Sequence, residues 1–110
     1  MEEQKITLLL DDSIVKTFVK AIEFYKLTSG YTNYGENIEE CQKIKEQIIN
    51  CISPNMTKQE IVLLLKTYNI GVLLNAIEFF NLANAFLGNR EGTEDCQIIR
   101  DEFVNCLLEK

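Results

Sequence analysis

Short apolar runs alternate with longer segments in which apolar residues recur every three or four positions. Residues 5–10 form one apolar run, and the apolar side chains of residues 13–29 follow helical spacing. Residues 38–52 follow it too, with Cys51 and all the isoleucines within about 80° of Cys41 around a helix. The pattern predicts a strand followed by two helices. The same three segments return at residues 60–65, 70–86 and 93–108.

This return is a duplication with an offset of 55 residues. Without any gap, 18 of 55 positions are identical, among them Ala21-Ile22-Glu23-Phe24 and its counterpart Ala76-Ile77-Glu78-Phe79. Two copies are too few for a solenoid, and each copy is small for an independent domain. The sequence therefore predicts one domain, residues 1–110, in which repeats 1–55 and 56–110 form a fused homodimer with an internal pseudo-two-fold axis.

We expect this domain to be α+β and mostly helical, with (βαα)×2 order and its two strands paired at the pseudo-axis. An all-α bundle is the alternative, because leucine is also a good helix former and Thr57-Lys-Gln-Glu60 has the spacing of a helix capping box. Residues 70–86 are apolar on nearly all sides, which predicts a helix buried on more than one face. Turn-forming residues predict loops at 28–37 and 85–93, and Ser53-Pro54-Asn55 predicts a tight joint between the repeats.

Composition and charge narrow the functional classes. The chain is 46% hydrophobic and 25% charged, as in ordinary globular proteins, and no apolar run is long enough to cross a bilayer. The acidic start of the chain is unlike a signal peptide, so we expect a cytoplasmic protein. A net charge of −6 argues against nucleic-acid binding. The absence of histidine removes the commonest general base and metal ligand, so we expect neither an enzyme, nor a metal site, nor a cofactor.

The four cysteines are two copies of one Cys-x9-Cys spacing. Small core residues on an apolar helix face are the leading interpretation, with reduced thiols. If the last helices of the two repeats pack antiparallel, Cys41 would face Cys106 and Cys51 would face Cys96. This second arrangement is similar to the twin Cys-x9-Cys helical hairpins of the mitochondrial intermembrane space.

Other residues are candidates for sites of binding or proton transfer. Glu23 and Glu78 would either meet across the axis as paired carboxylates or occupy the polar position of each helix. The two loops mix aromatic residues, amides and an arginine, which are enriched at binding surfaces. The predicted binding residues are Tyr31, Asn33, Tyr34, Phe86, Asn89 and Arg90.

The strands predict a contact between copies of the chain. Side chains alternate along a strand, so Ile6, Leu8 and Leu10 share one face and Thr7 and Leu9 the other. Both faces are largely apolar, and four helices cover only one of them. We expect a homodimer or larger oligomer. Its predicted interface residues are Leu9, Val62 and Leu64.

Two resemblances add context. Lys5-Ile-Thr-Leu-Leu-Leu-Asp-Asp12 and the helix after it resemble the ribbon-helix-helix family of DNA-binding dimers, here fused in tandem. In that family alternate strand residues read the major groove, whereas here these positions are Thr7, Leu9, Val62 and Leu64. The Lys-Ile-Thr-Leu opening and the Ala-Ile-Glu-Phe-Tyr helix are similar to short uncharacterised bacteriophage proteins.

These observations favour a non-enzymatic protein-binding module, such as a phage or mobile-element inhibitor of a host system. The alternatives are a ribbon-helix-helix-like transcriptional regulator and a protein that sequesters a small ligand through its two loops.

Overall fold

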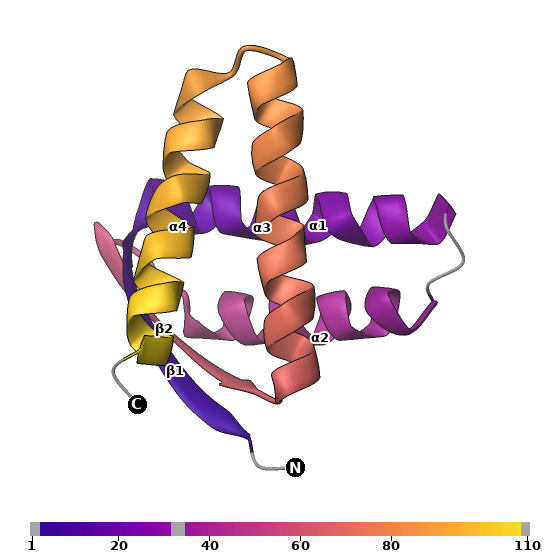
Figure 1. Ribbon diagram of the computed structural model, residues 1–110. Helices are drawn as coiled ribbons and strands as arrows, with labels where there is room; N and C mark the ends of the chain where they lie inside the picture. Colours follow the sequence, from indigo (N-terminus) through magenta and orange to yellow (C-terminus); the bar gives the residue numbers. More distant parts are fainter. Residues whose placement is uncertain (1–2, 32–34, 109–110) are drawn as a thin grey trace.

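The computed structural model describes residues 3–31 and 35–108. In chain order its elements are β1 (Gln4–Asp11), α1 (Asp12–Tyr31), α2 (Gly35–Cys51), β2 (Lys58–Leu65), α3 (Thr67–Phe86) and α4 (Arg90–Leu108). Over the described residues, two strands and four helices form a compact α+β domain (Figure 1). The α+β prediction is confirmed, and the all-α alternative is excluded.

The strands β1 and β2 pair as an antiparallel ribbon, with Thr7 opposite Val62. Because side chains alternate, one face of the ribbon lies inside the protein. Its side chains, each at most 2% exposed, are those of Ile6, Leu8, Leu10, Gln59, Ile61, Leu63 and Leu65. The strands predicted at residues 5–10 and 60–65 are confirmed and are slightly longer than expected.

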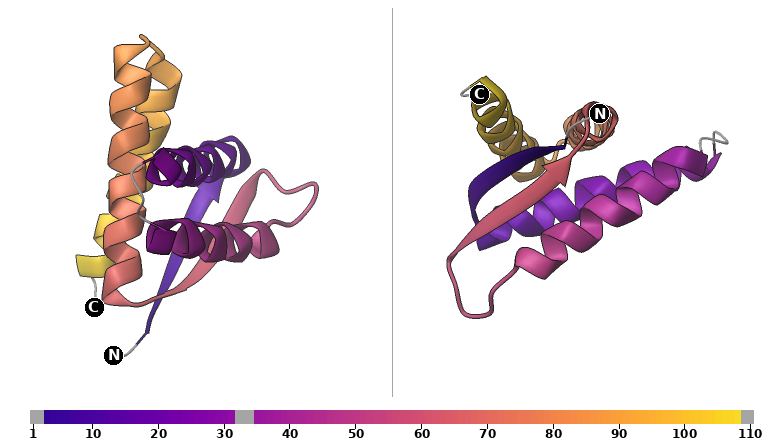
Figure 2. Two further views of the ribbon diagram at one scale, coloured as in Figure 1. Left: turned by 90° about the vertical axis from the view of Figure 1, so that its right-hand side faces the viewer. Right: turned by 90° about the horizontal axis from the view of Figure 1, so that it is seen from below.

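The helices form two hairpins, α1–α2 and α3–α4, that run across each other (Figures 1 and 2). The helices α1 and α3 pack together through two ring contacts, Phe24 with Phe80 and Tyr25 with Phe79, with centroids 5.6 and 5.3 Å apart. The outer helices lie beside the ribbon, α2 along β2 and α4 along β1. The core is therefore enclosed between the inner face of the ribbon and the two hairpins.

Corresponding carboxylates of the two repeats make corresponding ion pairs. The Lys45 ammonium lies 2.6 Å from the Glu23 carboxylate between α1 and α2, and Arg100 lies 3.2 Å from Glu78 between α3 and α4. The interpretation in which Glu23 and Glu78 meet each other is wrong, because each carboxylate faces the second helix of its own hairpin.

The four cysteines are all free. Cys41 and Cys96 are buried, which confirms the core interpretation for these two. Cys51 and Cys106 are half-buried beside the ribbon, where their Sγ atoms bond to backbone groups of the strands. The arrangement in which α2 and α4 pack antiparallel is wrong, because these helices make no contact with each other over the described residues. They flank different strands of the ribbon instead.

The first predicted loop, residues 28–37, is wrong for most of its length, because α1 continues to Tyr31 and α2 begins at Gly35. Thr28 is helical, and its hydroxyl is satisfied within the helix because it donates to two carbonyl oxygens of the preceding turn, at 3.0 and 3.1 Å. The second predicted loop is also shorter than expected, since α3 extends to Phe86 and α4 begins at Arg90.

The joint between the repeats is fixed by the buried side chain of Gln59. Its amide donates to the Ser53 carbonyl oxygen at 2.9 Å and to the Asp12 carboxylate at 3.0 Å, and it accepts from the Ser53 amide at 2.9 Å. Asn55 has a φ of 66°, a left-handed conformation that asparagine tolerates. The predicted tight joint is confirmed.

Candidate functional site

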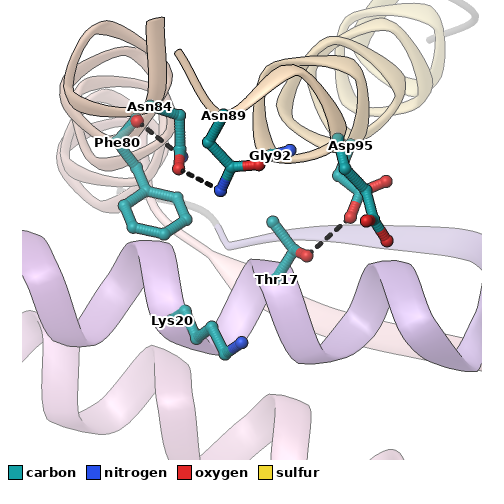
Figure 3. Close-up of a pocket in the computed structure, with 8 residues that line it drawn as sticks. Thr17, Lys20, Phe80, Asn84, Asn89, Gly92 and Asp95 are labelled. Carbon is teal, nitrogen blue, oxygen red and sulfur yellow. Dashed lines mark hydrogen bonds between the residues drawn. The ribbon is translucent and has the colours of Figure 1, made fainter. Parts of the chain in front are cut away.

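A small polar cleft opens where the α3–α4 turn passes over α1 (Figure 3). Its volume is about 190 Å³. The Thr17 hydroxyl donates to the Asp95 carboxylate at 2.7 Å and so connects α1 to α4. The residues that line the cleft are Thr17, Lys20, Phe80, Asn84, Asn89, Glu91, Gly92 and Asp95.

The amides of this cleft are used to close the helical turn. The buried Asn84 side chain donates to the Phe80 carbonyl oxygen at 2.8 Å, and its oxygen accepts from the Asn89 side chain at 2.9 Å (Figure 3). Asn89 in turn accepts from the Gly92 amide at 3.1 Å, which is the bond of a helix N-cap. A Cβ atom at Gly92 would lie 2.6 Å from the Asn84 side chain, so a larger residue would have to displace this hydrogen-bonded amide. The cleft is thus part of the turn, with Lys20 and Glu91 as its exposed charges.

The predicted binding residues that the structure describes lie at two separate places in the fold. Tyr31 is the last residue of α1, while Asn33 and Tyr34 lie outside the described residues. Phe86 ends α3 and Arg90 begins α4, at the turn drawn at the top of Figure 1, far from the end of α1 at its right. Asn89 caps α4. Phe86 is 91% exposed and Arg90 is also exposed.

The outer face of the ribbon is more polar than the sequence suggested. Leu9 and Leu64 are 55% and 51% exposed, and Val62 is half-buried. The strand ends add charges to this face, and Lys58 pairs with Asp11 at 3.4 Å. The face also holds Lys5, Thr7 and Glu60, all exposed. An antiparallel ribbon with such a face can border water, so a contact between copies at Leu9, Val62 and Leu64 stays a prediction.

A larger uncharged surface lies on α3. Six of its residues fall within about 60° of one line along the helix, and all six are exposed. We call this surface the α3 face. It consists of Tyr68, Gly71, Asn75, Phe79, Leu82 and Phe86.

The α3 face corrects the prediction that residues 70–86 form a helix buried on more than one face. The opposite side of α3 is in the core, where Leu73, Ala76 and Ile77 are buried, but the helix is not covered on its second side. In the left view of Figure 2, the upper part of α3 stands at the margin of the molecule, and the C-terminal end of α4 extends beyond its lower part. The sequence signal for this surface is the near-absence of charge from α3, a pattern that also predicts burial.

The two buried thiols offer little reactivity. Burial raises the pKa of the Cys41 thiol to about 11, with Glu23 and Glu40 adding to the effect and Lys26 opposing it. Burial likewise raises the pKa of the Cys96 thiol to about 11. These thiols stay protonated at neutral pH, so they are poor nucleophiles and poor metal ligands.

Within residues 3–31 and 35–108, no group of three potential metal ligands gathers, and none of the helices has the length and apolar character needed to span a membrane. No protein-family model, curated protein or solved structure matches the chain.

Proposed function

We propose that the chain is a non-enzymatic protein-binding module and that it binds through the α3 face. The observation that carries this proposal is the exposure of apolar side chains on a helix that has only one charged residue, Glu78. Tyr68 and Phe79 are each 48% exposed, Leu82 is 63% exposed and Phe86 is 91% exposed. Leu87, directly after the helix, is 78% exposed and extends the surface.

The size of this surface supports the proposal. An aromatic side chain has about 200 Å² to bury, so the three exposed rings alone present roughly 370 Å². With Leu82 and with Leu87, which lies just beyond the α3 face, the exposed apolar area is about 600 Å², the upper end of the range for the largest patch on a monomer. Contact surfaces of specific protein complexes cover about 800 Å² per partner. The α3 face therefore provides most of the area that a stable contact needs.

We also propose that the repeats are related by an approximate two-fold axis through the Thr7–Val62 pair. These two residues occupy the same position in their repeats and lie opposite each other in the ribbon. The contacts between Phe24 and Phe80 and between Tyr25 and Phe79 exchange with each other when the repeats are exchanged. A measured structure in which the two hairpins fail to superimpose would contradict the symmetry.

The experiment for the binding proposal is photo-crosslinking in cells. Benzoylphenylalanine replaces Leu82 in one variant and Leu27 in the control, because Leu27 is the repeat equivalent on α1 and is equally exposed, at 64% against 63%. We expect a discrete protein adduct from position 82 and none from position 27. If position 82 gives no adduct, or if both positions give the same adducts, the α3 face is not a protein-binding surface.

A further inference from the structure

The α3 face differs from the equivalent side of α1 in its charges. The helix α1 has five charged residues among 20, and α3 has one among 20. Lys16 and Lys20 are exposed on α1, and their repeat equivalents on α3 are Gly71 and Asn75, which are also exposed. The two helices share one ancestral pattern, yet only α3 has an uncharged outer side along its whole length. What binds there must itself present an uncharged, apolar surface.

Charge elsewhere on the molecule limits how two copies can meet. The net charge is −6, and α2 and α4 carry four and five acidic residues against two basic residues each. Two like-charged copies repel each other when such surfaces approach. At the α3 face this repulsion is smallest, because the only charge on α3, Glu78, is already paired with Arg100.

The shape of the α3 face fits another helix. Its residues follow a spacing of three and four positions over five turns, which is the seam of a helix pair. Gly71 lies open in this seam, and a Cβ atom built there has no heavy atom within 4 Å. Glycine is unfavourable in a helix interior, but at this position it allows a neighbouring helix to approach closely.

From the absence of charge on the α3 face, its exposed apolar area and its helical spacing, we infer that its partner is a second copy of this chain. In this dimer α3 packs against α3 of the partner. The inference rests on the proposed function and specifies the partner for the same surface. An uncharged apolar contact of about 600 Å² per copy, or about 1,200 Å² in total, reaches the lower end of the range for specific interfaces. Its apolar character is that of homodimer interfaces, which are more apolar than transient ones. The ribbon face, with its four charged residues, is the alternative contact between copies.

The experiment is analytical ultracentrifugation of the purified full chain at micromolar concentration. The main variant, Gly71→Lys with Asn75→Lys, gives α3 the lysines that α1 already has. Both positions are exposed and no atom obstructs a side chain at Gly71, so the fold should be retained, as circular dichroism will verify. Leu82→Lys is a second variant with an independent effect on the same face. Leu27→Lys is the matched control, and Leu9→Lys with Leu64→Lys tests the ribbon face.

We expect the wild type to sediment at twice the chain mass of 12.7 kDa. The two α3 variants should sediment as folded monomers, with the dissociation constant raised by about 100-fold or more, while the Leu27 control remains a dimer. A monomeric wild type overturns the inference, as does a dimer that survives both α3 variants. A monomer produced by the ribbon variant alone would place the contact at Leu9 and Leu64 instead. If the wild type is a monomer but position 82 still crosslinks to a different protein, the binding proposal holds and only the identity of the partner is wrong.

Discussion

Gln47 on α2 protects the outer edge of β2, and exchanging it with its repeat equivalent gives a sharp test of the fold. Its side-chain oxygen accepts from the Leu64 amide at 2.8 Å, and its NH₂ group donates to the Leu64 carbonyl oxygen at 3.3 Å. One side chain thus satisfies both backbone groups that an edge strand would otherwise leave unpaired. The repeat equivalents of these residues are Glu102 on α4 and Leu9 on β1.

Gln47→Glu should destabilise the protein by about 1 kcal/mol. A carboxylate still accepts from the Leu64 amide but cannot donate to the carbonyl oxygen, and the loss of one hydrogen bond costs about 0.5–1.5 kcal/mol. The site is exposed, which lowers this cost, whereas the new repulsion between carboxylate and carbonyl raises it. Protonation restores a donor, so the folded state should raise the pKa of the new carboxyl group. The stability deficit is then smallest below pH of about 4 and grows as pH rises through that value.

Glu102→Gln should have the opposite effect and stabilise the protein. The spacing between Glu102 and Cys106 equals that between Gln47 and Cys51, and Cys106 donates to the Thr7 carbonyl oxygen, two residues before Leu9. A glutamine at position 102 can therefore pair with both backbone groups of Leu9, and we expect a gain of up to about 1 kcal/mol. Glu94→Gln, on the exposed side of the same helix, controls for the removal of one negative charge.

The assay is urea denaturation followed by circular dichroism, together with hydrogen exchange of the Leu64 amide. Gln47→Glu should lower the unfolding midpoint without changing the slope and should accelerate exchange at Leu64. The reasoning is refuted if Gln47→Glu costs less than about 0.3 kcal/mol at neutral pH. It is refuted equally if Glu102→Gln gains no more than the Glu94 control.

Three further predictions follow from burial in the core and in the α3–α4 turn. Gly92→Ala should lower the free energy of unfolding by about 1–3 kcal/mol, because its Cβ would lie 2.6 Å from Asn84. Gly71→Ala has open space around it and should raise the free energy of unfolding by up to about 1 kcal/mol. Equal effects of the two variants in thermal unfolding would contradict this. Burial raises the pKa values of Cys41 and Cys96 from 9.0 to about 11, so their contribution to folding stability is complete below pH 9 and is lost as pH rises to 11. Cys41→Ala should reduce this loss of stability at alkaline pH, and an unchanged dependence of stability on pH would argue against it. Phe18→Ala and Phe103→Ala, both at fully buried positions, should each cost about 3–5 kcal/mol in denaturant unfolding, and a cost below that of an exposed Phe86→Ala would place the core elsewhere.

The elements were predictable because local pattern dominates them. The strands were correct to within two residues because their apolar runs are short and are followed by helix-capping residues. The end of α1 was missed because Thr28, Ser29 and Gly30 are common in turns. Within α1 the Thr28 hydroxyl finds its acceptors in the preceding turn, which the sequence does not reveal.

The relations between the helices were harder to predict, since a duplication reveals equivalent positions but not how the copies are oriented. Antiparallel packing of α2 against α4 would bury the apolar faces of both helices, as packing against the strands does. The structure instead places each helix beside a strand, where Cys51 and Cys106 bond to backbone groups. The binding residues at the predicted loops were chosen by composition, and composition cannot separate a helix cap such as Asn89 from a ligand contact.

The error about α3 is the most informative one, because a helix that buries two faces and a helix that exposes an interface have the same sequence signature. Both lack charge on every side. Burial in the chain's own core accounts for Leu73 and Ile77, but Leu82 and Phe86 have no cover within the described residues. The comparison with α1 separates the two cases, since its lysines at positions 16 and 20 show that this fold accepts charge on the outer side of the central helix. The uncharged residues at 71 and 75 are therefore not required by the fold of one chain, and this is the argument for the partner that we propose at the α3 face.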